Sequence, residues 1–128
     1  MYELKLSELT KMIVKELEKD GLSTSLKNPQ SDSEFPCAVV GTPLKSVLLT
    51  ENGVPVRTAL SIPVEYWANK KYEAMDISDD GDKKLSELNF VRVNTTIDMY
   101  DDITKKYRYG GNYEVIYNGL TNALERRR

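Results

Sequence analysis

Hydrophobic residues recur every three to four positions near the start of the chain and predict its first helix. Within SELTKMIVKELEKDG, Leu9, Ile13 and Leu17 lie four residues apart, which is the spacing of one helical face. Ser7 suits the N-terminal cap, and Gly21 suits the left-handed residue that ends many helices. We expect the apolar face of this helix to pack against the core of its own protein rather than against a partner.

The next segments indicate a loop, a short strand and a hairpin. STSLKNPQSDSE is polar and predicts a loop, whereas FPCAVVG predicts a buried strand in which Cys37 is a small apolar residue. The segment LKSVLLTENGVPVRTALSIPVEYW predicts two strands around a tight turn at Asn52-Gly53. Because Pro63 has no N–H to donate, the second of these strands is expected at a sheet edge or with a bulge.

The pattern then returns to the helical period. In ANKKYEAMDISDDGDKKLSELN, one helical face would carry Tyr72, Met75, Leu85 and Leu88. Gly81 is the weak point of this second helix, because glycine costs about 1 kcal/mol relative to alanine inside a helix.

The C-terminal third alternates again. FVRVNTTIDMYD predicts a strand, and KKYRYGGNYEVIYNG predicts a hairpin that turns at Gly110-Gly111-Asn112. The tail LTNALERRR predicts a short helix or a frayed end. The whole order predicts one α+β domain over residues 1–128, in which two helices cover one face of a mostly antiparallel sheet.

Composition narrows the function. The chain has 128 residues, 40% of them hydrophobic and 30% charged, with a net charge of -2. This composition is typical of a globular domain, and the net charge produces no positive electrostatic potential that would attract nucleic acid. Since no apolar run has the length of a membrane span, we expect no membrane association.

The cysteine and histidine counts argue against most catalytic chemistry. Cys37 is the only cysteine and the chain has no histidine, which excludes an intrachain disulfide, a cysteine zinc cluster and catalysis by a Ser–His or Cys–His pair. An enzyme that uses carboxylates alone stays open, but we expect no enzyme and no cofactor.

One segment resembles a calcium-binding loop. In DISDDGDKKLSE, acidic and hydroxyl residues stand at ligand positions, and Gly81 stands at the sharp-turn position. The ligands would be Asp76, Ser78, Asp80, Asp82 and Glu87. However, Lys83 occupies a position that is normally apolar, and the motif has no second copy. We therefore favour exposed acids on or around a helix, and keep a small calcium-binding module as the alternative.

Two other charged segments carry residues that could bind a ligand or act as acids and bases. KKYRYGGNY mixes basic and aromatic residues, which can stack single-stranded bases, but an acidic chain without a recognised module predicts no nucleic-acid specificity. Its aromatic side chains are expected to be packed or to lie at an interface. Asp98, Asp101 and Asp102 are interpreted as part of a surface turn near the end of a strand.

The order of several segments resembles a known family. EFPCAVVG followed by a proline, SIPVEYWANKKYEAMDIS, LNFVRVNTTIDMYDD and KKYRYGGNYEVIYNGLTN together resemble the tail terminator proteins of long-tailed phages with non-contractile tails. These are also called tail completion or minor tail proteins, and prophages of Gram-positive bacteria often encode them. The resemblance extends from the first helix to GLTN. Head–tail connector and head-completion proteins of similar size are the alternative.

The resemblance implies a structural role in the virion. A tail terminator forms a hexameric ring that caps the tail tube, ends its polymerisation and docks to the head connector, after assembly in the bacterial host cytoplasm. Its partners would be copies of itself, the tail tube protein and the head connector protein, and the family has no catalytic residues.

Tyrosine content fits an assembly role. The chain has eight tyrosines and two phenylalanines, and tyrosine is common at protein interfaces. Charges of both signs suit contacts between two different patches on neighbouring subunits. The candidate interface residues, which include the hairpin at 51–57, are Tyr107, Arg108, Tyr109, Tyr113, Asn52 and Arg57.

Overall fold

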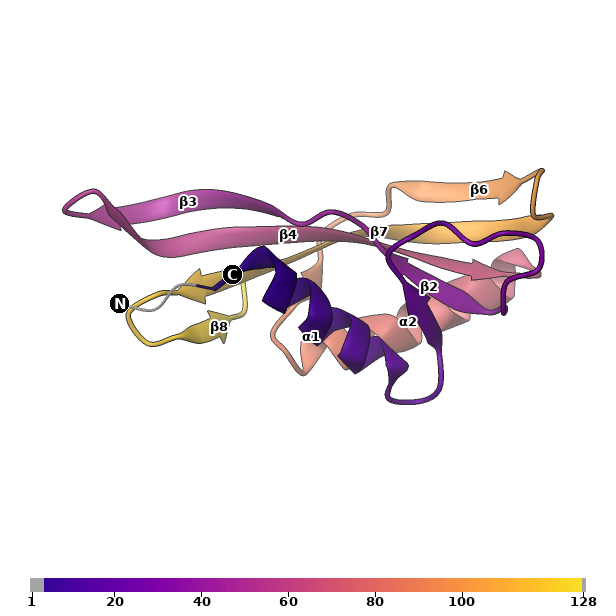
Figure 1. Cartoon of the computed structure of the whole chain (residues 1–128), viewed down its shortest axis with the longest axis horizontal. Coiled ribbons are helices and arrows are strands. Elements are labelled where there is room, and N and C mark those ends of the chain that lie inside the picture. The colour runs from indigo at the N-terminus through magenta and orange to yellow at the C-terminus, as the bar shows by residue number, and fades with distance from the viewer. Residues whose placement is uncertain (1–3, 128) are drawn as a thin grey trace.

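The computed structural model describes residues 4–127. Two helices lie on one side of an eight-stranded, mostly antiparallel sheet, which confirms the α+β prediction (Figure 1). The elements are α1 (Leu6–Glu18), β1 (Ser23–Ser25), β2 (Cys37–Val40), β3 (Leu44–Glu51), β4 (Val54–Ala68), α2 (Lys71–Ser86), β5 (Val91–Arg92), β6 (Ile97–Asp101), β7 (Lys106–Asn118) and β8 (Ala123–Glu125).

Strands β4 and β7 form the centre of the sheet. They pair antiparallel from Arg57 opposite Asn118 to Ala68 opposite Tyr107. On the edge of β4 that faces away from β7, β4 pairs with β2 and β3. On the edge of β7 that faces away from β4, β7 pairs with β5, β6 and β8. The sheet is long, with the β3–β4 hairpin at one end and the β6–β7 turn at the other (Figure 1).

The core lies between the helices and one face of the sheet. Residues on that face alternate along β4 and β7, because successive side chains of a strand point to opposite sides. The main buried cluster contains Leu9, Ile13, Leu17, Ala38, Val40, Leu60, Ile62, Val64, Tyr66, Leu85, Phe90, Tyr113, Val115 and Tyr117. The apolar stripe predicted on the first helix is thus confirmed as a core contact.

The first hairpin forms as predicted. Asn52 and Gly53 have φ angles of 52° and 77° and connect β3 to β4, which is the left-handed pair that a two-residue hairpin turn requires. Gly21 also has a positive φ, 84°, after α1. The prediction that Ser7 caps the first helix was wrong. The helix begins at Leu6, and its cap residue, Lys5, makes no side-chain hydrogen bond.

The second predicted hairpin was wrong. Residues 106–118 form one continuous strand, β7, and Gly110 and Gly111 lie in its middle. A Cβ atom at Gly110 would lie 2.8 Å from the Cα of Glu65, and one at Gly111 would lie 2.8 Å from the carbonyl carbon of Asn94. The two glycines therefore permit a close backbone approach on each side of β7 rather than a turn.

Pro63 was also predicted wrongly, because β4 is a central strand. The carbonyl of Pro63 accepts a hydrogen bond from the Gly41 N–H at 2.8 Å. Gly41 lies between the end of β2 and the start of β3. The two polar groups of a strand residue point to the same side, so the missing donor of Pro63 faces this break in the neighbouring strands.

Three smaller predictions were wrong. The predicted loop contains β1, which pairs parallel with β2. The strand predicted in FVRVNTTIDMYD is divided into β5 and β6, and the tail forms β8 instead of a helix. A short strand can be added wherever a longer neighbour leaves unpaired backbone groups, and local pattern does not report this.

Candidate interaction surface

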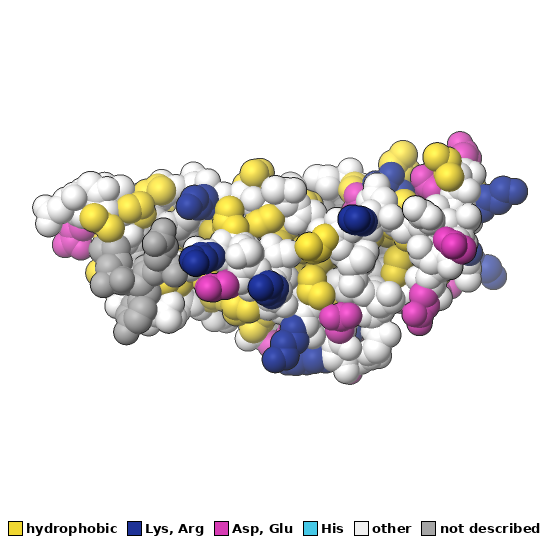
Figure 2. All heavy atoms as spheres, viewed as in Figure 1, with side chains coloured by type: hydrophobic (Ala, Val, Ile, Leu, Met, Phe, Trp, Pro, Cys, Tyr) yellow, Lys and Arg dark blue, Asp and Glu magenta, His cyan; other side chains and the backbone are white. Residues whose placement is uncertain are grey.

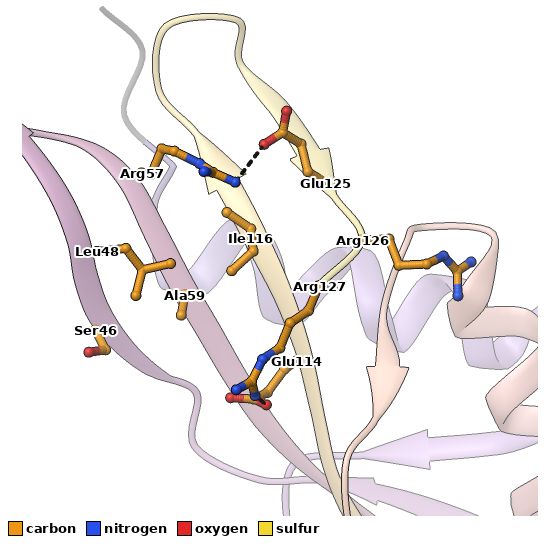
Figure 3. Close-up of a pocket in the computed structure, with 9 residues that line it drawn as sticks. All are labelled: Ser46, Leu48, Arg57, Ala59, Glu114, Ile116, Glu125, Arg126 and Arg127. Carbon is orange, nitrogen blue, oxygen red and sulfur yellow. Dashed lines mark hydrogen bonds and ion pairs between the residues drawn. The ribbon is translucent and has the colours of Figure 1, made fainter.

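A cleft of about 840 Å³ opens on the face of the sheet that the helices leave uncovered. Its residues come from β3, β4, β7, β8 and the segment after β8, as Figure 3 shows. Leu48, Ala59 and Ile116 form an apolar floor. Ala59 is the smallest of the three, and its short side chain lies between the two larger ones (Figure 3).

Two ion pairs border this floor. Arg57 contacts Glu125 at 3.5 Å on one side, and Arg127 pairs with Glu114 on the other (Figure 3). Arg126 lines the cleft but points away from the floor, and donates to the backbone carbonyl of Ser86 at 3.1 Å. The lining thus holds three arginines and two glutamates, which leaves an excess of one positive charge.

The β3–β4 hairpin exposes apolar side chains on both of its faces. Leu48 is 55% exposed and borders the cleft. Val47 and Val54 border a second groove, of about 300 Å³, which is also lined by residues of the helix-covered face such as Leu60. Every residue of β3 is exposed, and within residues 4–127 this strand pairs only with β4. A long apolar edge strand of this kind is a template for contact with another chain.

The opposite end of the sheet also exposes hydrophobic surface. Ile103 is 86% exposed in the turn between β6 and β7, and Met99 and Tyr100 are half-exposed on β6. Figure 2 shows hydrophobic surface along the hairpin at one end of the molecule and near the end of β6 at the other, flanked there by acidic and basic side chains.

The turn that carries Ile103 is ordered by internal hydrogen bonds. The Asp101 carboxylate accepts from the Thr104 N–H at 2.8 Å and from the Thr104 hydroxyl at 2.6 Å. The Lys105 N–H donates to the Asp101 carbonyl at 2.8 Å, and Lys105 has a φ of 58°. Donation from the Thr104 hydroxyl, and then from its N–H, lowers the pKa of Asp101. The turn therefore presents Ile103 in a fixed position.

Three of the predicted interface residues lie near this end with partners inside the chain. The Arg108 guanidinium binds Glu65 at 2.9 Å and stacks 4.7 Å from the centre of the Trp67 ring. Tyr107 donates to Asp98, and Tyr109 lies against the Arg92 guanidinium. All three predicted residues are half-buried.

Tyr113 cannot be an interface residue in this fold, because its side chain is fully buried. Its hydroxyl donates to Asp82 and accepts from the Tyr66 hydroxyl at 2.8 Å. Burial raises the pKa of both phenols above the ordinary value. By contrast, Asn52 and Arg57 are exposed in and beside the hairpin, and Arg57 borders the cleft.

Four of the five residues of the candidate calcium loop lie on a helix instead, and the fifth, Glu87, follows its last residue. Asp76, Ser78, Asp80 and Asp82 belong to α2, which is continuous through Gly81 and ends at Ser86. Ser78 is buried and accepts from Arg92, which also contacts Asp82 at 2.9 Å. These side chains do not surround a common point, so the calcium alternative does not fit this helix. Among residues 4–127, no group of three acids, cysteines or histidines could hold a metal ion.

The predicted face of this helix needs correction too. Ala74, Ser78, Gly81 and Leu85 are the buried residues of α2, whereas Tyr72 is 79% exposed. Gly81 is buried against Tyr66, so its lack of a side chain serves packing.

Cys37 lies in the smaller buried cluster with Val39 and Trp67, against Phe35. Burial, and then the nearby charge of Glu34, raises the pKa of its thiol to about 11. The thiol is therefore protonated and inert at neutral pH, as expected for a small core residue.

The sequence contained two signals for the interaction surface that pattern reasoning missed. Val47-Leu48-Leu49 places large apolar residues on both faces of one strand, although a half-covered antiparallel strand needs them on one face only. Ile103 is an isolated apolar residue between two aspartates and TKK. Both features place apolar side chains where no neighbouring part of the chain can bury them.

Comparison with known proteins adds no assignment. No protein-family model matches the chain, and a search of curated proteins gave no match. No helix within residues 4–127 is long and apolar enough to span a membrane.

Proposed function

We propose that this protein is a structural component of a phage virion, a tail terminator that caps the tail tube and provides the docking surface for the head connector. It acts through contacts between folded surfaces and not through catalysis. In this proposal, copies of the chain form a closed ring, expected to be hexameric, which meets the tail tube protein on one side and the connector on the other.

The observation that carries the proposal is the exposure of apolar surface at both ends of one long sheet. Leu48 and Leu49 are more than half-exposed at the hairpin end, and Ile103 is 86% exposed at the other. When two copies join through two different patches, the resulting dimer still has one free patch of each kind. Further copies therefore add until a ring closes. The order of sequence segments that resembles tail terminators supports the same role.

Deletion of the coding sequence from the parent prophage tests the proposal. Electron microscopy of the induced lysate should show abnormally long tails that are separate from filled heads, and wild-type protein supplied from a plasmid should restore tail length. Normal-length tails beside heads that have lost DNA would contradict tail termination and favour a head-completion protein.

A fold-preserving control is available on the helical side. The variant Asp80→Ala changes an exposed residue of α2, away from both apolar ends, and should restore tail length as fully as the wild type. Normal virions from the deletion strain would contradict both structural roles.

A further inference from the structure

We propose that the β6–β7 turn of one copy docks into the cleft on the uncovered sheet face of the next copy, with Ile103 as its apolar anchor. This inference rests on the self-assembly part of the proposed function, and not on the tail itself. The occupant of the cleft is therefore a second copy of this chain.

The turn has the properties of a docking element. Two hydrogen bonds to the Asp101 carboxylate fix Thr104, so the turn loses little freedom on binding. Ile103 projects from this ordered turn with 86% of its surface exposed. A rigid turn that displays a large apolar side chain gains nothing from it within the monomer, whereas burial in a partner is favourable.

The cleft has properties that match the turn. Leu48, Ala59 and Ile116 provide an apolar floor at its centre, and charged groups provide a polar rim, which is the usual organisation of a protein interface. Its volume of about 840 Å³ accommodates the side chains around the tip of a turn as well as Ile103.

Each site has one unpaired charge that is opposite in sign to one at the other site. Asp102 is exposed beside Ile103 and has no hydrogen bond or ion pair with any described residue. Arg126, at the rim of the cleft, has no carboxylate partner among residues 4–127 and binds only a backbone carbonyl. Docking brings the Asp102 carboxylate to a cleft whose lining carries one excess positive charge, which favours correct orientation.

The positions of the two sites determine the kind of contact. The turn lies at one end of the long sheet, whereas the cleft is lined by residues from the half of the sheet that carries the β3–β4 hairpin (Figure 1), so one copy cannot fill its own cleft. The contact joins unlike patches, and each added copy again exposes one free turn and one free cleft. Such a contact is heterologous and closes into a ring when the rotation between copies allows it.

Disulfide trapping between two variants tests the contact directly. Ile103→Cys and Leu48→Cys proteins carrying different tags are mixed at high concentration and oxidised. The mixture should give a cross-linked heterodimer at least about tenfold above either variant alone, as expected when each protein supplies only one half of a specific contact. The native Cys37 does not compete, because it is buried and its thiol pKa is raised.

Tyr72→Cys provides the matched control. Tyr72 is 79% exposed at the start of α2 and belongs neither to the turn nor to the cleft lining, so its mixture with Leu48→Cys should cross-link only at background level. The inference is overturned if Ile103→Cys reacts with Leu48→Cys no better than Tyr72→Cys does. It is also overturned if Ile103→Cys alone gives dimers as efficiently as the mixture, since that indicates a symmetric contact.

Charge reversal gives a second, independent measurement. Asp102→Arg and Arg126→Asp should each reduce cross-linking in the trapping assay, and combining the two reversals across the contact should restore it. If both single variants remain folded but the combined reversals do not restore cross-linking, the predicted pairing of charges is contradicted.

The outcome also separates this inference from the proposed function. Specific cross-linking together with normal virions from the deletion strain leaves the docking contact standing and removes the tail role. If the deletion strain gives long tails and an Ile103→Glu variant restores their normal length as fully as the wild type does, the tail role stands and the docking contact is removed.

Discussion

The hydroxyl of Tyr66 occupies the space that a side chain at Gly81 would need. A Cβ atom at position 81 would lie 2.5 Å from the Tyr66 Cζ and still closer to the hydroxyl oxygen. Tyr66 is fully buried and its hydroxyl is bound to Tyr113, so the ring has no room to withdraw. This contact explains why a helix tolerates glycine at its centre.

Replacement of Gly81 by alanine should therefore destabilise the protein. Overpacking should lower the free energy of unfolding by about 1–3 kcal/mol, although alanine favours the helix by about 1 kcal/mol. Denaturant unfolding measures the difference. Asp80→Ala, an exposed change in the same helix, should stay within about 0.5 kcal/mol of wild type. Equal stability of Gly81→Ala and wild type would contradict the packing argument.

Removal of the Tyr113 hydroxyl should break the buried chain of hydrogen bonds. In Tyr113→Phe, the Tyr66 hydroxyl loses its hydrogen bond to Tyr113, and Asp82 keeps its ion pair with Arg92. A buried polar group without a partner costs about 1–3 kcal/mol, which thermal or denaturant unfolding detects. Tyr100→Phe, at a half-exposed tyrosine, is the matched control and should unfold like the wild type.

The same pair of tyrosines should make stability fall at alkaline pH. Burial raises the pKa of Tyr66 and Tyr113 in the folded protein, whereas the unfolded chain ionises near the ordinary value of about 10. Above that pH the unfolded state binds fewer protons than the folded state, so the free energy of unfolding decreases as pH rises. Unfolding measured from pH 8 to 11 should show this decrease, and Tyr113→Phe should weaken it. An identical pH slope in both proteins would exclude Tyr113 as a source.

Gly111→Ala should be more damaging than Gly81→Ala. The added Cβ would meet the backbone of Asn94 and Thr95, and backbone atoms cannot move aside as a side chain can. We expect a larger loss of unfolding free energy, or insoluble protein on expression. Ser61→Ala, in the neighbouring central strand, supplies the control and should remain soluble. A well-folded Gly111→Ala protein would show that β5, β6 and the segment between them shift readily.

The Asp101 carboxylate should control the order of the turn that presents Ile103. Asp101→Ala removes the carboxylate oxygen that accepts both hydrogen bonds from Thr104, so amide exchange of Thr104, measured by NMR, should accelerate while the sheet stays protected. Because the pKa of Asp101 is lowered, this contribution is present above the ordinary aspartate pKa of about 3.9. It should be lost as pH falls through the lower folded value. Unchanged exchange in the variant would contradict this role.

The sequence alone determined the class of fold, because periodicity reports burial directly. The four-residue spacing of Leu9, Ile13 and Leu17 specified a helix with one buried side, and all three are buried. Asn52-Gly53 specified a turn, since few residue pairs accept two positive φ angles. These features depend on neighbours within a few positions, so local sequence contains the information.

Tertiary structure alone decided the role of the glycines and the place of the exposed apolar residues. Gly81, Gly110 and Gly111 face atoms from distant parts of the chain, including Tyr66, Val64 and Asn94. Locally, each of these glycines indicated a break or a turn. The cleft likewise combines side chains from positions 46 to 127, and Ile103 became significant only because the folded turn leaves it outside the core. Contacts between remote segments depend on the folded path of the chain, which no short pattern specifies.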